Sequence, residues 1–314
     1  MSERDSSLEG RARKTGLIAF VGIVLGLAGL SVALAFLPVP PRLVPIVYLL
    51  VGAVFIAAPV FALFRAADHP WRPWLAVVFI GVGVSAHVGL AYAAAILGPR
   101  GVWPATLSSL AQTGLMTWCA GLGALLATLL KEKNMLIPVA IFLAAFDVFT
   151  LLTPAGPTQA IMRAQPQIFE SVSWTVPKVQ EVPTFGPVAA TARIGPADFL
   201  FMAMFFVALY RFQMRVRATY LWLAPTLVAY MVFVFVAGPL PALVPIGICV
   251  LIVNWREFRL TAQEWGATAL VAALGLGLIA WGMTRPKPPP EPSPPAPVPG
   301  FLGSAGSPSP AIPN

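Results

Sequence analysis

Two aspartates, Asp147 and Asp198, lie within long apolar stretches of this sequence, where carboxyl groups are rare. The other acidic residues lie in the termini or in connecting segments. An ionisable carboxyl inside a bilayer is costly unless it meets a partner or water, and no Lys or Arg lies in the same stretches, so the two aspartates indicate a functional site. If they lie close together, the two carboxyls would share a proton, so that one could activate water while the other protonates a carbonyl oxygen.

The positions of the two aspartates predict that they meet. Asp147 lies six residues before the end of the apolar stretch 135–153, and Asp198 lies four residues after the start of the stretch 194–210. At about 1.5 Å per helical residue, both carboxyls should lie ~6 to ~9 Å from one membrane face. Consecutive spans run in opposite directions, so we expect Asp147 and Asp198 to face each other at similar depth.

A third unusual feature is predicted at the same membrane face. The apolar stretch 240–253 opens with the sequence Pro239-Leu240-Pro241-Ala242-Leu243. Two prolines remove two backbone donors, so the start of this span should be non-helical and packed against protein or water. The sequence therefore predicts that two carboxyls and one irregular backbone segment come together.

The composition identifies the bilayer as the environment of these residues. Of the 314 residues, 58% are hydrophobic and 10% are charged, against roughly 45–50% and about 25% in soluble globular chains. The net charge of +8 comes from Lys and Arg scattered between apolar runs, which is typical of membrane topology and argues against nucleic acid as a partner.

Cys119 and Cys249 lie in apolar runs and are interpreted as buried hydrophobic residues. The single intramembrane His87 makes no metal site and should bond a neighbouring helix.

The fold class predicted is all-α, a multi-pass transmembrane helical bundle of about nine spans. A span needs about 20 mostly apolar residues. The nine candidate stretches are 15–37, 43–64, 74–97, 106–130, 135–153, 194–210, 218–237, 240–253 and 266–283. The paired glycines within them, namely Gly22 with Gly26, Gly81 with Gly83, Gly121 with Gly123 and Gly275 with Gly277, are predicted to be helix-packing positions.

The chain is expected to be organised around a core at residues 135–253. Of the 20 Lys and Arg, 13 lie on one side of the predicted spans and seven on the other. This bias places the N-terminus in the cytoplasm. The expected segments are a cytoplasmic N-terminus 1–14, four N-terminal spans in 15–134, the core 135–253 with an outside loop 154–193, a last span in 254–284, and a disordered Pro-rich tail 285–314. Within the loop, Ser173 to Pro177 has β-prone character; it is interpreted either as an edge that holds an unwound segment or as an ordinary loop.

Three short motifs resemble those of the presenilin and signal peptide peptidase family of intramembrane aspartic proteases. An aromatic residue precedes the first aspartate, a Gly-rich motif ends at the second, and Pro-Ala-Leu follows two spans later. In this chain the motifs are Phe146-Asp147, Gly195-Pro196-Ala197-Asp198 and Pro241-Ala242-Leu243. The chain departs from the family in having Phe146 where a Tyr is usual, Ala197 where a second Gly is usual, and four spans before Asp147 where the family has five.

The resemblance implies a presenilin-like catalytic core in a prokaryotic-type membrane enzyme. It implies that Asp147 and Asp198 are catalytic, using water with no metal and no cofactor. It further implies that the remaining motif residues shape the active site and bind substrate. These residues are Phe146, Gly195, Pro196, Ala197, Pro241, Ala242 and Leu243. The expected substrates are transmembrane proteins or peptides in the lipid bilayer, and the expected location is a prokaryotic cell membrane. The sequence does not identify accessory subunits.

Two other functions remain open from the sequence. Paired membrane carboxyls also serve as proton relays in proton-coupled transporters. A catalytically inactive homologue that only binds membrane helices would carry the same motifs. A transporter predicts substrate flux that depends on a proton gradient, and an inactive binder predicts complexes that survive loss of the aspartates.

Overall fold

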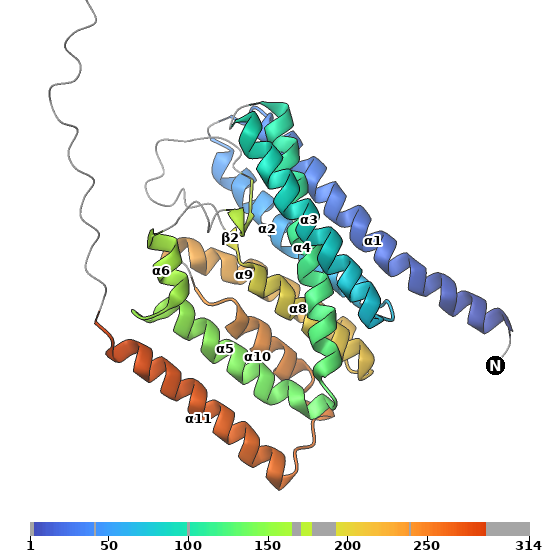
Figure 1. Ribbon diagram of the computed structural model, residues 1–314, viewed down its shortest axis with the longest axis vertical. Coiled ribbons are helices and arrows are strands. Elements are labelled where there is room, and N and C mark those ends of the chain that lie inside the picture. Colours follow the sequence, from blue (N-terminus) through green and yellow to red (C-terminus); the bar gives the residue numbers. More distant parts are fainter. Residues whose placement is uncertain are drawn as a thin grey trace, which may run out of the picture.

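The computed structural model describes residues 3–40, 42–98, 101–164, 171–177, 193–238 and 240–286. These residues form a bundle of α-helices with one short two-stranded ribbon (Figure 1). The helices are α1 (Glu3–Ala35), α2 (Val44–Ala67), α3 (Pro73–Leu97), α4 (Val102–Leu129), α5 (Leu136–Leu152), α6 (Pro157–Ala164), α8 (Pro196–Arg211), α9 (Val216–Ala237), α10 (Leu243–Val253) and α11 (Ala262–Thr284), with 3-10 turns at Lys133–Met135 and Trp255–Glu257. The strands are β1 (Trp174–Thr175) and β2 (Arg193–Ile194).

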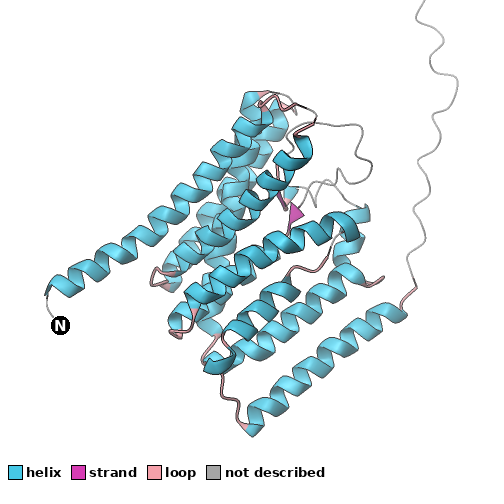
Figure 2. Ribbon diagram, turned by 180° about the vertical axis from the view of Figure 1, so that it is seen from behind, coloured by secondary structure: helices cyan, strands magenta, loops and turns pink. Residues whose placement is uncertain are grey.

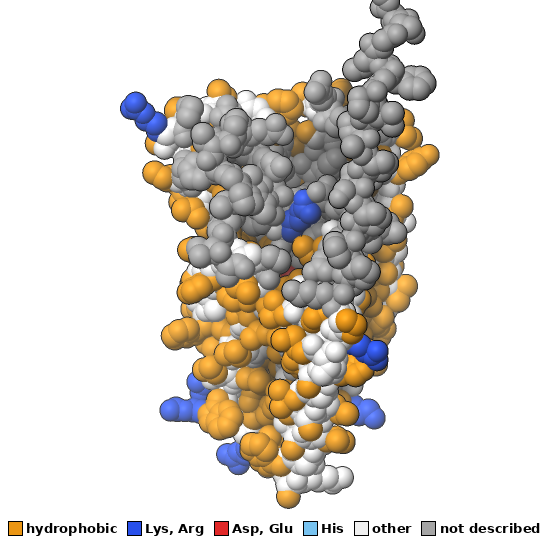
Figure 3. Space-filling model, turned by 90° about the vertical axis from the view of Figure 1, so that its left-hand side faces the viewer, with side chains coloured by type: hydrophobic (Ala, Val, Ile, Leu, Met, Phe, Trp, Pro, Cys, Tyr) orange, Lys and Arg blue, Asp and Glu red, His pale blue; other side chains and the backbone are white. Residues whose placement is uncertain are grey.

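The helices confirm an all-α, multi-pass membrane protein. Seven helical segments in the described residues are long and apolar enough to cross a bilayer, and they comprise α1 to α5, α9 and α11. The helix α10 is apolar but has only 11 residues, and α8 has 16. Each predicted stretch overlaps one of these helices. The number of true spans, expected to be nine, stays a prediction. Where the view in Figure 3 shows described residues, hydrophobic side chains predominate on the surface, as lipid contact requires.

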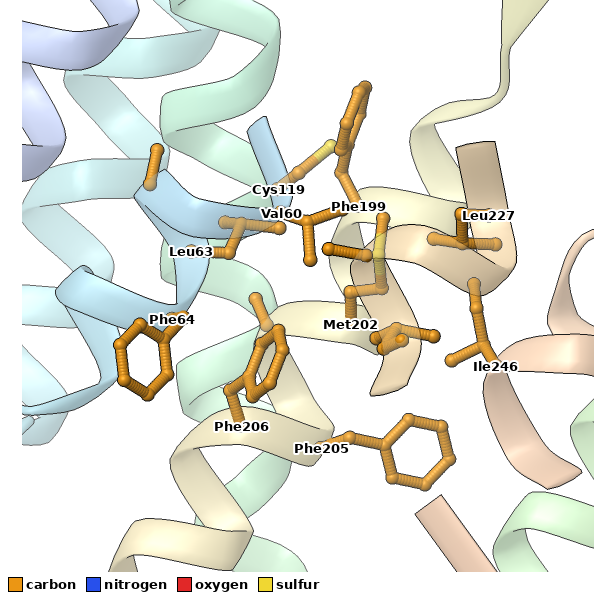
Figure 4. Close-up of a cluster of buried hydrophobic side chains, with 14 of the residues drawn as sticks. Val60, Leu63, Phe64, Cys119, Phe199, Met202, Phe205, Phe206, Leu227 and Ile246 are labelled. Carbon is orange, nitrogen blue, oxygen red and sulfur yellow. The ribbon is translucent and has the colours of Figure 1, made fainter. Parts of the chain in front are cut away.

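The helix α8 lies at the centre of the bundle. It packs against α4 and α2 on one side and against α9 and α10 on the other. In Figures 1 and 2, α1 and α3 lie at one end of the arrangement and α11 lies outermost at the other, against α5. Figure 4 shows Phe199, Met202, Phe205 and Phe206 of α8 among side chains from α2, α4, α9 and α10. The carboxyl-bearing start of α8 is therefore held from several directions.

Close backbone contact joins α3 to α4. A side chain at Gly83 would meet the backbone of Gly114 and Trp118, and one at Gly114 would meet the backbone of His87. Small residues at such positions let two helices approach until their backbones touch. One turn away, Nδ1 of His87 lies 2.9 Å from the Ala111 carbonyl oxygen. The prediction that His87 bonds a neighbouring helix is confirmed.

The glycine predictions are correct at some positions and wrong at others. Gly83, Gly121, Gly123 and Gly275 each lie against a neighbouring helix. No heavy atom of a neighbouring element lies within 4 Å of the place a side chain would occupy at the other four, which are Gly22, Gly26, Gly81 and Gly277. Spacing alone marks a small-residue face, but it does not say whether that face turns toward protein or lipid.

Several expected boundaries differ in the structure. The helix α1 begins at Glu3, so the expected N-terminal segment 1–14 is largely a continuation of the first helix. The expected loop 154–193 contains the helix α6 and both strands. The helix α10 begins at Leu243, three residues after the predicted start of that stretch. Its first hydrogen bond runs from the Ile246 N–H to the Ala242 carbonyl oxygen, because Pro245 has no N–H to donate to the carbonyl of residue 241. The Pro-rich tail from residue 287 onward lies outside the described residues.

The packing of α4 on α8 predicts the effect of a single methyl group. A Cβ at Gly123 would overlap the Leu200 carbonyl oxygen and lie 2.7 Å from the Ala203 Cβ. We expect Gly123→Ala to lower the free energy of unfolding by about 1–3 kcal/mol because the two backbones must separate. Thermal unfolding of the purified protein in detergent, followed by tryptophan fluorescence, measures the change.

The matched control is Gly89→Ala in α3, where no neighbour lies within 4 Å of the new methyl group. We expect its midpoint to be unchanged or raised, because alanine favours a helix over glycine by up to about 1 kcal/mol. Equal unfolding midpoints for Gly123→Ala and Gly89→Ala would contradict the close approach of α4 and α8.

Candidate active site

Asp147 lies in the last two turns of α5, a helix of apolar residues that ends at Leu152. Its side chain is half-buried, and its Oδ2 accepts a hydrogen bond of 2.8 Å from the backbone N–H of Leu243, the first residue of α10. The first N–H groups of any helix lack partners within that helix. The start of α10 therefore supplies a donor to a membrane carboxylate, with the favourable dipole of a helix N-terminus.

Asp198 lies in the first turn of α8, three residues after the N-cap Gly195. The Gly195 N–H donates to Asp198 Oδ2 at 3.1 Å, and the Asp198 N–H donates to the Gly195 carbonyl oxygen at 3.2 Å. Pro196 suits the first helical position, because its missing N–H would have no partner there. The motif residues thus start α8 and fix the second carboxyl at its positive end.

The structure brings the two aspartates together through α10. The helix α10 packs against both α5 and α8, and Gly247 of α10 lies against the Ala140 backbone of α5. Asp147 and Asp198 are close enough for their charges to interact. The helix α10 therefore joins the two helices that carry the carboxyls, while a carboxyl pair close enough to share a proton stays a prediction.

The Pro-Ala-Leu segment forms the predicted irregular opening of α10. Leu240 and Pro241 are not helical, and Ala242 lies in a turn. Pro241 and Leu243 are buried, so this stretch of open backbone is packed inside protein, as a membrane interior requires. Pro239, which was also expected to be unwound, lies outside the described residues.

The other predicted motif residues have different surroundings. Gly195 has ordinary extended backbone angles, with φ −69° and ψ 154°. A Cβ there would lie 3.5 Å from Asp198 Oδ2, an ordinary van der Waals distance, so packing does not require a glycine at this position. Ala197 is exposed. The Phe146 ring is 41% exposed and stacks on Phe142 along the outer side of α5, with ring centroids 6.0 Å apart.

Two residues that the sequence analysis did not single out for the site lie beside the motifs. The Tyr230 hydroxyl on α9 donates to the Pro241 carbonyl oxygen at 2.9 Å, and the charges of both aspartates reach Tyr230. The Cys119 thiol on α4 donates to the Pro196 carbonyl oxygen at 3.3 Å. A phenol inside an otherwise apolar span is the signal that could have identified Tyr230, because buried tyrosine hydroxyls usually have partners.

The β-prone residues before α8 do form a strand. Trp174 and Thr175 pair with Ile194 and Arg193 in an antiparallel register, so β2 leads directly into Gly195. The Trp174 ring is buried and lies between Phe55 of α2 and Phe199 of α8. The ribbon is therefore anchored to the core beside the second motif. A role of its edge in holding substrate stays a prediction.

A metal site is not formed by the described parts of the chain, because no three His, Cys, Asp or Glu side chains gather there. The chemistry available at the site is that of two carboxyls, a phenolic hydroxyl and backbone N–H groups. Such groups can transfer protons and bind a carbonyl oxygen or water.

No family model matches the chain, and no curated protein or solved structure matches it either. The resemblance to intramembrane aspartic proteases therefore rests on the three motifs, Phe146-Asp147, Gly195 to Asp198 and Pro241 to Leu243, and on their arrangement in space.

Proposed function

We propose that this protein is an intramembrane aspartic endopeptidase that hydrolyses peptide bonds in or near transmembrane segments of other proteins. The observation that carries the proposal is the hydrogen bond from Leu243 N–H to Asp147, in a bundle where Asp147 also interacts with Asp198. This bond joins the Pro-Ala-Leu motif to the first aspartate motif, although 96 residues separate them. This contact between two motifs far apart in the sequence supports the proposal.

The proposed reaction uses the two carboxyls as a proton-transferring pair. One carboxylate accepts a proton from water as the water oxygen attacks the peptide carbonyl carbon, and the other carboxyl gives its proton to the carbonyl oxygen. The C–N bond then breaks: the nitrogen leaves with a proton from one carboxyl, and a hydroxyl of the diol returns a proton to the other carboxylate as the carbonyl re-forms. The balance requires only water and peptide.

The apolar surroundings favour a substrate that arrives through the bilayer. Asp147 and Asp198 lie in helices made mostly of apolar residues, which suits a substrate segment that is itself apolar. A transmembrane segment is already in hydrocarbon and can reach the bundle laterally. Its helix must open locally, because intact helical hydrogen bonds shield the peptide bond.

Replacement of either aspartate by asparagine tests the proposal. In Asp147→Asn and Asp198→Asn the shape of the side chain is kept but the proton transfer is lost, so we expect cleavage to fall by about 10²- to 10⁴-fold in each. The measurement is the rate of cleavage of a tagged single-span reporter by purified protein in liposomes. Asp68→Asn, at the end of α2, is the matched control and should cut at the wild-type rate.

The alternative functions give different results in the same liposomes. If folded wild-type protein cuts no reporter and binds no peptide that carries a hydroxyl transition-state isostere, the endopeptidase proposal is wrong. Proton flux that Asp147→Asn abolishes would then favour a proton-coupled transporter. Reporter complexes that survive both aspartate substitutions would favour an inactive helix-binding protein.

A second prediction concerns the proline that keeps the start of α10 open. Pro241 fixes its own φ and disfavours helical backbone at Leu240, so the segment before Leu243 is held open and the Leu243 N–H stays directed at Asp147. In Pro241→Ala these backbone restrictions are lost, and the Leu243 N–H is directed less firmly at Asp147. We expect reporter cleavage to fall by about tenfold or more, the effect of about 1.4 kcal/mol on the barrier.

The matched control is Pro73→Ala, which changes a proline in the first turn of α3, away from the site. Cleavage by Pro73→Ala should equal that of the wild type. Full activity of a folded Pro241→Ala protein would show that the open backbone is not needed.

A further inference from the structure

Tyr230 donates to a carbonyl that the helix α10 cannot satisfy itself. In a continuous helix the carbonyl of residue 241 would accept from the N–H of residue 245. Residue 245 is a proline and has no N–H. The Tyr230 hydroxyl, 2.9 Å from the Pro241 carbonyl oxygen, occupies that place. A backbone carbonyl without a partner would be costly inside a membrane, so this contact stabilises the open segment.

The same short segment carries the donor to Asp147. Pro241 accepts from Tyr230 of α9, and two residues later Leu243 donates to Asp147 of α5. Only Ala242 separates the two residues. A change in the orientation of the Pro241 carbonyl therefore turns the next peptide planes and moves the Leu243 N–H relative to the carboxyl.

The other end of α10 is fixed independently. Asn254 is fully buried; its Nδ2 donates to Thr219 Oγ1 at 2.9 Å, and its Oδ1 accepts from the Arg215 N–H at 3.0 Å. Both partners lie at the start of α9. The helix α9 thus holds α10 at two points, and loss of the Tyr230 contact would release only the end at the aspartates.

We propose that Tyr230 is a positioning residue of the aspartate site: its hydroxyl holds the Pro241 carbonyl so that the Leu243 N–H is directed at Asp147. This role rests on the proposed endopeptidase function only for its effect on catalysis, since the geometry itself does not depend on the reaction. Tyr230 acts through the backbone of α10, and it needs no contact with substrate.

The test is Tyr230→Phe, which removes the hydroxyl and keeps the ring. We expect kcat for reporter cleavage to fall by about fivefold to tenfold, with KM unchanged, because the site is misplaced while the route of substrate entry is intact. Tyr220→Phe is the matched control: Tyr220 lies on the same α9, and its ring stacks on Phe64 of α2, away from the aspartates. Its kcat and KM should equal those of the wild type.

A second readout is independent of catalysis. Hydrogen exchange of the backbone amides of residues 240–246, measured by mass spectrometry without substrate, should be faster in Tyr230→Phe than in the wild type or Tyr220→Phe. Faster exchange together with no cleavage by any form of the protein would support the positioning role and reject the endopeptidase proposal. Unchanged exchange in Tyr230→Phe would overturn the positioning role, whatever the activity.

A rescue experiment tests whether the Tyr230 hydroxyl acts through the Pro241 carbonyl or through another contact of its side chain. Pro245→Ala introduces an N–H one turn after Pro241, which can donate to the same carbonyl in place of the missing hydroxyl. We expect the double variant Tyr230→Phe/Pro245→Ala to recover most of the slow exchange and of kcat relative to Tyr230→Phe. Additive losses in the double variant would overturn the assignment of Tyr230 to the Pro241 carbonyl.

Discussion

The need to satisfy backbone polar groups in hydrocarbon governs the architecture of this bundle. A helix meets that need alone, but residues 240–242 are not helical and must find partners elsewhere. The Pro241 carbonyl finds Tyr230, and the Leu243 N–H finds Asp147. Asp147 gives the Leu243 N–H an acceptor, and the same hydrogen bond stabilises the carboxylate. The open backbone and the intramembrane carboxyl therefore each lower the free-energy cost of the other.

The sequence predicted the elements with strong local signals. Long apolar runs identified the helices, Asp147 and Asp198 stood out against them, and the proline at 241 located the open backbone. Contacts that depend on tertiary packing could not be read in the same way. Gly22 and Gly26 have the spacing of a packing pair but meet no neighbouring element, because the rotation of a helix about its axis is set by its partners.

Polar side chains near helix ends were the hardest to predict. The Arg211 Nη1 donates to the Ala127 and Leu130 carbonyl oxygens and so satisfies the end of α4, a contact that the sequence does not indicate. Asn254 gave no signal in the sequence, because one asparagine after an apolar run is common at a helix end. Their roles follow from which helix termini the fold places side by side.

The short length of α10 indicates how far the aspartate site lies from each membrane face. Its 11 residues rise only about 16 Å, roughly half of a hydrocarbon layer of about 30 Å. From Asp147 to the far end of α5, the chain rises a further ~9 Å or less toward the side where α6 and the ribbon lie. The path for water is therefore shorter from that side, and polar chain ends released by cleavage would have their nearest aqueous exit there.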